Sequence, residues 1–105
     1  MEKKEFEGKI GATFSVLLEE DQRTPLKGLD LKLDTVDPLK KIEGADHVAN
    51  LREEPFSLVF VGPEEHHLPD DSYTMSIEGW ENQIIFISAF KQEKGKGIFY
   101  DAVFN

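Results

Sequence analysis

The residues best suited to chemistry lie in one short segment rich in acids and histidine. Residues 64–67 read EEHH and residues 70–71 read DD, and imidazoles beside carboxylates can bind Zn²⁺ or Ni²⁺. Adjacent residues of an extended loop point in opposite directions, which argues against a dedicated site. The flanking Gly-Pro and Leu-Pro pairs predict a solvated turn. We therefore expect no metal and no cofactor, with weak binding at His66 and His67 as an alternative.

Paired carboxylates are a second source of chemistry, as a general acid and base. Acidic runs occur at 19–21, 53–54, 64–65 and 70–71, all at predicted turns or segment edges. A general acid needs burial to raise its pKa, whereas carboxylates in turns stay hydrated. Asp101 differs because it interrupts an apolar strand. It could be a functional carboxylate, but an outward position on an edge strand is the favoured interpretation.

Other catalytic and nucleic-acid motifs are missing from the sequence. It contains no Cys and no Ser in a G-x-S-x-G context, and Gly95-Lys96-Gly97 lacks the spacing of a phosphate-binding loop. Lys91, Lys94 and Lys96 form the single basic cluster of a strongly acidic chain. These features predict a protein that is not an enzyme and does not bind nucleic acid.

Trp80 is the single residue that we single out for partner binding. It lies in a predicted turn at residues 79–82, which read GWEN. The ring could fold back and cap the core, or it could be exposed and act as a contact hot spot.

Alternating apolar and polar residues predict six short strands that would position these groups. The strands are expected around residues 14–18, 29–34, 56–61, 73–77, 83–90 and 98–104. In the fifth, Ile84, Phe86 and Phe90 share one side while Ile85 and Ile87 share the other. The fold class is therefore all-β, a small antiparallel barrel or sandwich, formed as a single domain over residues 1–105.

The long connection over residues 37–54 breaks this alternation. Asp37 and Pro38 fit the N-cap and the first position of a helix, and Gly44 fits its end. Residues 46–52 fit a second turn of helix. One or two short helical turns are expected in this connection.

Composition and charge exclude several classes of protein. The 105 residues include 12 Lys and Arg against 21 Asp and Glu, a net charge of −9 that repels nucleic acid and anionic lipid. No apolar run approaches the roughly 18 residues of a membrane span. Residues 1–7 are charged and no apolar stretch follows them, which predicts a cytoplasmic protein without a secretory signal.

Several segments resemble a bacterial domain of unknown function, the DUF6916 family. Residues 52–63, REEPFSLVFVGP, are similar to its central motif, and so are Leu68-Pro69, Tyr73-Thr74, the ending YDAVFN and the G-x-x-F at 11–14. Pro55 and the Gly79-Trp80 turn depart from the pattern. The resemblance implies a compact bacterial β domain whose members often accompany phage-tail-like or tail-collar genes. It implies no catalytic residues.

The combined interpretation is a non-enzymatic structural or protein-interaction module, monomeric or weakly self-associating. A free sheet edge on the first or last strand would accept a strand of a partner that carries a basic patch, with Trp80 or the 64–71 loop adding specificity. The alternative is a small-ligand or enzymatic site inside a barrel, although eight Phe would fill most of that interior.

Overall fold

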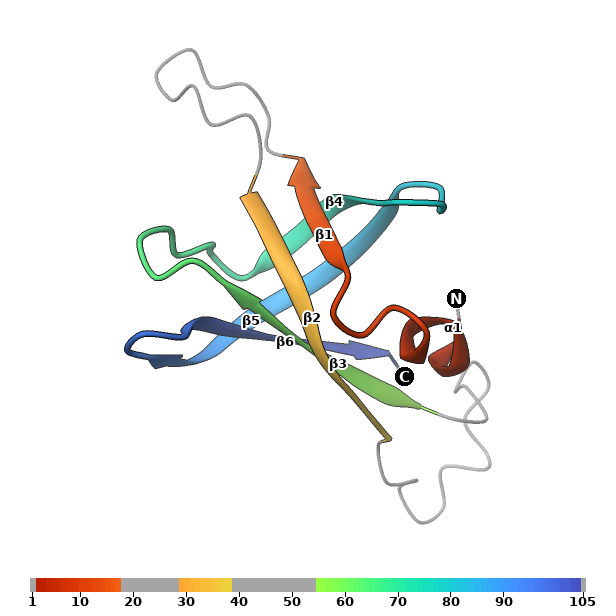
Figure 1. Ribbon diagram of the computed structural model, residues 1–105, viewed down its shortest axis with the longest axis horizontal. Coiled ribbons are helices and arrows are strands. Elements are labelled where there is room, and N and C mark those ends of the chain that lie inside the picture. Colours follow the sequence, from red (N-terminus) through yellow and green to blue (C-terminus); the bar gives the residue numbers. More distant parts are fainter. Residues whose placement is uncertain (1, 18–28, 39–54, 105) are drawn as a thin grey trace.

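A computed structural model describes residues 2–17, 29–38 and 55–104 as one helix and a six-stranded barrel (Figure 1). The elements are α1 (Lys3–Glu7), β1 (Thr13–Leu17), β2 (Leu29–Pro38), β3 (Phe56–Gly62), β4 (Asp71–Ile77), β5 (Gln83–Glu93) and β6 (Gly97–Phe104). Every neighbouring pair is antiparallel, and the order β1-β2-β3-β6-β5-β4 closes on itself. The predicted all-β class and the six strands are confirmed, and the fold is a barrel rather than a sandwich.

Closure of the barrel removes the free edges that the sequence suggested. β1 pairs with both β2 and β4, and β6 pairs with both β3 and β5. The prediction that a partner adds a strand to the first or last strand is therefore wrong, because both already have two hydrogen-bonded neighbours. Asp101 faces outward as predicted, but it does not lie on an edge strand.

The predicted helix start at Asp37-Pro38 is also wrong. These two residues end β2, where Asp37 pairs with Ser57 and Pro38 with Phe56. The end of a strand tolerates proline, and the long ladder with β3 outweighs the local capping signal. The remainder of the predicted helical connection, residues 39–54, lies outside the described residues. The described part of the chain contains no helix long and apolar enough to cross a membrane.

An aromatic cluster closes the end of the barrel where α1 lies, at the right of Figure 1. The pattern of apolar and polar residues did not predict this helix. Its Phe6 is buried, with ring centroids 5.3 Å from Trp80, 5.3 Å from Phe104 and 5.7 Å from Phe56. Phe56 and Phe104 are partners in the β3–β6 register and stack with centroids 4.9 Å apart. A short helix thus completes the core by inserting one aromatic side chain.

The loop over residues 63–70 closes the opposite end of the barrel, at the left of Figure 1. Leu68 is buried, and its amide donates a hydrogen bond of 2.9 Å to the hydroxyl of Tyr100. That hydroxyl donates in turn to the carbonyl of His66 at 3.4 Å. Burial raises the pKa of Tyr100, and the bond from Leu68 partly offsets the rise. The neutral phenol therefore fixes this loop to the core.

At the start of β6, the backbone of Gly97 lies very close to the end of β3. Gly97 has a φ of 134°, and a Cβ there would overlap the carbonyl oxygen of Gly62 on β3. Glycine is required at this position by both backbone conformation and space.

Candidate interaction surface

β5 is apolar on both of its faces, which distinguishes it from an ordinary strand of a small barrel. Ile85 and Ile87 point inward and are buried. Ile84, Phe86 and Phe90 point outward, and their exposed fractions are 75%, 57% and 52%. A barrel strand normally carries polar residues on its solvent face, so this apolar surface needs an explanation.

A β-bulge in β5 concentrates the exposed apolar surface beside β6. The register shifts between Ala89, which pairs with Tyr100, and Lys91, which pairs with Phe99. Phe90 is the extra residue, and its ring centroid lies 6.4 Å from that of Phe99. The Lys91 Nζ lies 4.4 Å from the Phe99 ring centroid on the same side of the sheet. Phe99 is therefore only 7% exposed, although it lies outside the cluster of core side chains.

Outward residues of β6 and β3 extend this surface across the barrel. Val103 on β6 is 50% exposed, and Val59 and Val61 on β3 are half-buried. We call the combined surface the β5 face; it comprises Val59, Val61, Ile84, Phe86, Phe90, Phe99, Asp101 and Val103. Among the described residues, four of the six exposed large hydrophobic side chains lie on it, and Ile10 and Leu17 are the other two.

Asp101 is the one acidic residue among the side chains of the β5 face, and Lys91 lies over Phe99 on the same side of the sheet. Asp101 pairs with Val59 on β3 and with Ser88 on β5, and along its own strand the next outward residues are Phe99 and Val103. Burial raises its pKa, and a hydrogen bond from the amide of Ala102 only partly opposes that rise. The described residues contain no ion pair to this carboxylate.

A second carboxylate lies on the other side of Ser88. The Ser88 hydroxyl donates to Asp70 Oδ2 at 2.9 Å, and the Ala89 amide donates to Asp70 Oδ1 at 3.3 Å. Asp70 precedes β4, so these bonds fix the end of the 63–70 loop to the bulge of β5. The middle of the β5 face is consequently negative as well as apolar.

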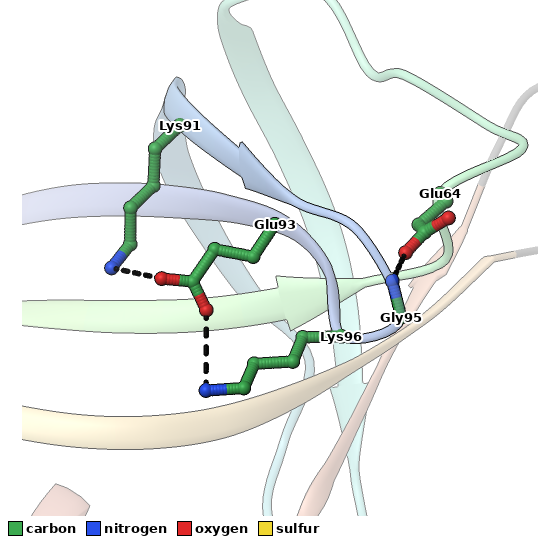
Figure 2. A network of polar contacts seen from close by, with 5 residues as sticks. All are labelled: Glu64, Lys91, Glu93, Gly95 and Lys96. Carbon is green, nitrogen blue, oxygen red and sulfur yellow. Dashed lines mark hydrogen bonds and ion pairs between the residues drawn. The ribbon is translucent and has the colours of Figure 1, made fainter.

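The basic cluster predicted from the sequence lies at the β5–β6 turn, where one glutamate pairs with two of its three lysines (Figure 2). Glu93 accepts from Lys91 Nζ at 3.3 Å and from Lys96 Nζ at 3.4 Å. Hydrogen bonds from Lys91, and then from Lys96, lower the pKa of Glu93. The Glu64 carboxylate accepts from the Gly95 amide and so connects the turn to the 63–70 loop. Polar contacts thus connect the β5–β6 turn with the 63–70 loop.

Trp80 caps the core, which is one of the two roles that the sequence left open for it. Its ring is half-buried and meets Phe6 and Phe14 edge-on, with centroids 5.3 Å and 6.3 Å apart. Lys9 Nζ lies 5.4 Å from the Trp80 centroid and donates to the carbonyl of Glu78 at 3.1 Å. The ring therefore has a structural role, and its part in partner binding stays a prediction.

The structure does not bring His66 and His67 together with further metal ligands. Both side chains are exposed on the 63–70 loop. Within residues 2–17, 29–38 and 55–104, no group of three or more His, Asp or Glu side chains could hold a metal ion. The third histidine, His47, lies outside the described residues. Metal binding at this loop therefore gains no support from the geometry.

Large side chains occupy the interior of the described barrel. The largest fully buried ones are Tyr100, Phe6, Phe14, Phe56, Phe60, Leu31, Leu33, Leu58, Met75, Ile87 and Val16. An open groove of about 610 Å³ lies outside the core along β1 and β4. Its lining includes Lys9, Ser15 and Ser76, but Ser15 already donates to Asp30 at 2.9 Å. The β5 face is a more distinctive surface than this groove.

The family comparison agrees with the motifs noted in the sequence. The family model described as "Domain of unknown function (DUF6916)" matches residues 1–104. The chain belongs to the DUF6916 family. No curated protein and no solved structure matches the chain. DUF6916 membership spans every described strand of the barrel, but the family description assigns no activity.

A partial signal for the β5 face is present in the sequence. The alternation correctly places Ile84, Phe86 and Phe90 on one side of a strand and Ile85 and Ile87 on the other. Because both sides are apolar, the pattern could not show which side faces solvent. The bulge that adds Phe90 to Phe99 has no visible signal in the sequence.

Proposed function

We propose that this DUF6916 domain is a non-enzymatic interaction module that binds a protein partner through the β5 face. The observation that carries the proposal is the concentration of exposed apolar side chains on one side of a barrel whose interior is filled. Exposed apolar side chains gathered on neighbouring strands are typical of contact sites, and aromatic residues are enriched in such sites.

Side chains, rather than an added strand, would make the contact, because the barrel is closed. Phe86 is the natural anchor, since it is aromatic, exposed and flanked on its strand by Ile84. Phe90 lies at the other end of the face. A partner that covers these rings would bury apolar area worth about 25 cal/mol per Å² before the costs of association.

The net charge of −9 favours a partner with a basic patch and disfavours nucleic acid and anionic membranes. The DUF6916 resemblance adds a bacterial setting and an accessory role in a phage-tail-like or similar assembly, and we place the protein in the cytoplasm. The protein itself would be a monomer or a weak homo-oligomer.

The test is affinity capture at low salt from the cells that produce the protein, with bound species quantified by mass spectrometry. Wild type is compared with Phe86→Ser and with Ile10→Ser, a matched control because Ile10 is 52% exposed, close to the 57% of Phe86, but lies between α1 and β1. We expect one stoichiometric protein on wild type and Ile10→Ser, depleted about tenfold on Phe86→Ser and released by high salt.

Two results would contradict the proposal. Equal capture by Phe86→Ser would place the contact elsewhere on the molecule. A bound small molecule or metal ion in native mass spectra, without a protein partner, would favour a ligand site. Circular dichroism of each variant shows whether the barrel remains folded.

A further inference from the structure

Asp101 makes the β5 face selective about what can cover it. Its carboxylate already loses part of its water to Phe99, Val59 and Val103, and the only described hydrogen bond to it comes from the Ala102 amide. A partner that covers the face removes more of that water. An unpaired buried carboxylate is costly, so a purely apolar partner would be penalised.

Within residues 2–17, 29–38 and 55–104, no cation forms an ion pair with this carboxylate. Lys91 lies opposite Phe99, two positions along β6 from Asp101. Its ammonium group lies over the Phe99 ring and pairs with Glu93 at 3.3 Å. The nearby carboxylate of Asp70 adds negative charge beyond Ser88. The β5 face therefore offers an anionic centre with apolar surroundings.

We propose that the β5 face binds a protein segment that places one Arg or Lys on Asp101 and packs apolar side chains around Phe86 and Phe90. This inference rests on the proposed function and names the chemistry of its partner. Charge complementarity at Asp101 decides the occupant, and arginine suits it best because a guanidinium can donate two hydrogen bonds to one carboxylate.

The same charge argues against a second copy of the chain as the occupant. A symmetric dimer through this face would bring the two Asp101 carboxylates toward each other, with a net charge of −9 on each subunit. Like charges facing each other across an interface are unfavourable. The acidic centre thus disfavours self-association through the β5 face while it accepts a cationic partner.

The experiment uses a displayed library of random linear peptides, selected on the immobilised full-length chain. Enriched sequences are synthesised, and their affinities are measured by fluorescence anisotropy against wild type, Asp101→Asn, Phe86→Ser and Ile10→Ser. Asp101→Asn keeps the shape of the side chain, removes its charge and replaces one acceptor oxygen with an amide donor. We expect enriched peptides with one Arg or Lys flanked by apolar residues. Their binding should weaken about tenfold or more in Asp101→Asn and in Phe86→Ser and stay unchanged in Ile10→Ser.

The outcomes separate this inference from the proposed function. Enriched peptides that lack a basic residue, or that bind Asp101→Asn as well as wild type, would overturn the cation on Asp101 and leave the β5 face as the contact. Equal loss in Ile10→Ser would show non-specific binding and overturn the site. If no peptide is enriched, the proposal that the occupant is a linear cationic segment is wrong. The capture experiment tests the proposed function independently of this result. Concentration-dependent dimers of wild type that Phe86→Ser abolishes would identify a second copy as the occupant instead.

Discussion

Strands β2 and β5 have the same task inside the barrel and opposite surfaces outside it. Leu31 and Leu33 of β2 point into the core as Ile85 and Ile87 of β5 do. The exposed residues of β2 over the corresponding length are Asp30, Lys32 and Asp34, whereas those of β5 are Ile84, Phe86 and Phe90. Folding requires the inner set in both strands, so the difference outside must have another cause.

Polar side chains on the outer side of β2 form hydrogen bonds within the strand and with β1. The Ser15 hydroxyl donates to Asp30 at 2.9 Å, and the Thr35 hydroxyl donates to Asp37 at 2.9 Å. Alternating charge also resists a slip in register, because a shift of one residue would bury Asp30 and Lys32. β5 lacks this protection and leaves two phenylalanines in solvent. The comparison shows that the barrel does not need an apolar outer surface, which is the reason to assign the β5 face to contact.

The largest expected effects come from the inner side, where the two strands should behave alike. Leu31→Ala on β2 and Ile87→Ala on β5 should each lower the free energy of unfolding by about 2–4 kcal/mol, because both side chains are fully buried. Urea unfolding followed by circular dichroism measures the loss. The matched outer variant Ile84→Ala should change stability by less than about 0.5 kcal/mol. A large loss of unfolding free energy in Ile84→Ala would show that the outer side of β5 also stabilises the fold, and would contradict the distinction drawn between its inner and outer sides.

An intermediate effect is expected when the outer side of β5 is made to resemble that of β2. Phe86→Lys should leave the free energy of unfolding within about 1 kcal/mol of wild type, because the side chain is exposed. Retention on a hydrophobic interaction column should fall, and selected peptides should no longer bind. Ile10→Lys adds the same charge away from the β5 face and should preserve peptide binding. If Phe86→Lys still binds these peptides, Phe86 is not part of the contact.

Much of the fold could be predicted because alternation is a local signal. The leucines of β2 and the apolar run of β3 identify strands directly, whereas closure into a barrel rather than a sandwich is visible only in the structure. The sequence did not show α1, because a helix of five residues is defined by the docking of Phe6 rather than by propensity. The helix start predicted at Asp37-Pro38 is wrong because pairing of these residues with β3 outweighs their local capping signal.

The site was harder to predict than the fold. Asp101 is visible in the sequence as a charge within an apolar strand, but its neighbours Val59 and Ser88 come from β3 and β5. Strand order determines those neighbours, and alternation carries no information about strand order. Trp80, His66 and His67 were predicted as candidate binding residues because of their residue types. In the structure, the exposed apolar surface is formed instead by phenylalanine and isoleucine residues on the outer side of the barrel.

The smallest expected effect concerns Asp101 itself and its dependence on pH. Burial raises the pKa of this carboxyl in the native state, so the native state holds the proton more tightly than the unfolded chain does. Its contribution to stability is therefore favourable at low pH and is lost as the pH rises through the native pKa. Asp101→Asn removes this loss. The stability of the variant relative to wild type should rise by about 0.3 kcal/mol between about pH 4 and pH 7, within the usual range for partly exposed sites.

Asp30→Asn on β2 is the control, because it removes the same charge from the acidic chain at a carboxylate that accepts a bond from Ser15. Urea unfolding of both variants and of wild type across this pH range isolates the part that belongs to Asp101. A variant that is more stable at neutral pH and yet binds cationic peptides more weakly would show that Asp101 is kept for contact at a cost to folding. If Asp101→Asn is instead less stable than Asp30→Asn at pH 7, an interaction within the chain already stabilises the carboxylate, and no partner cation is needed to explain it.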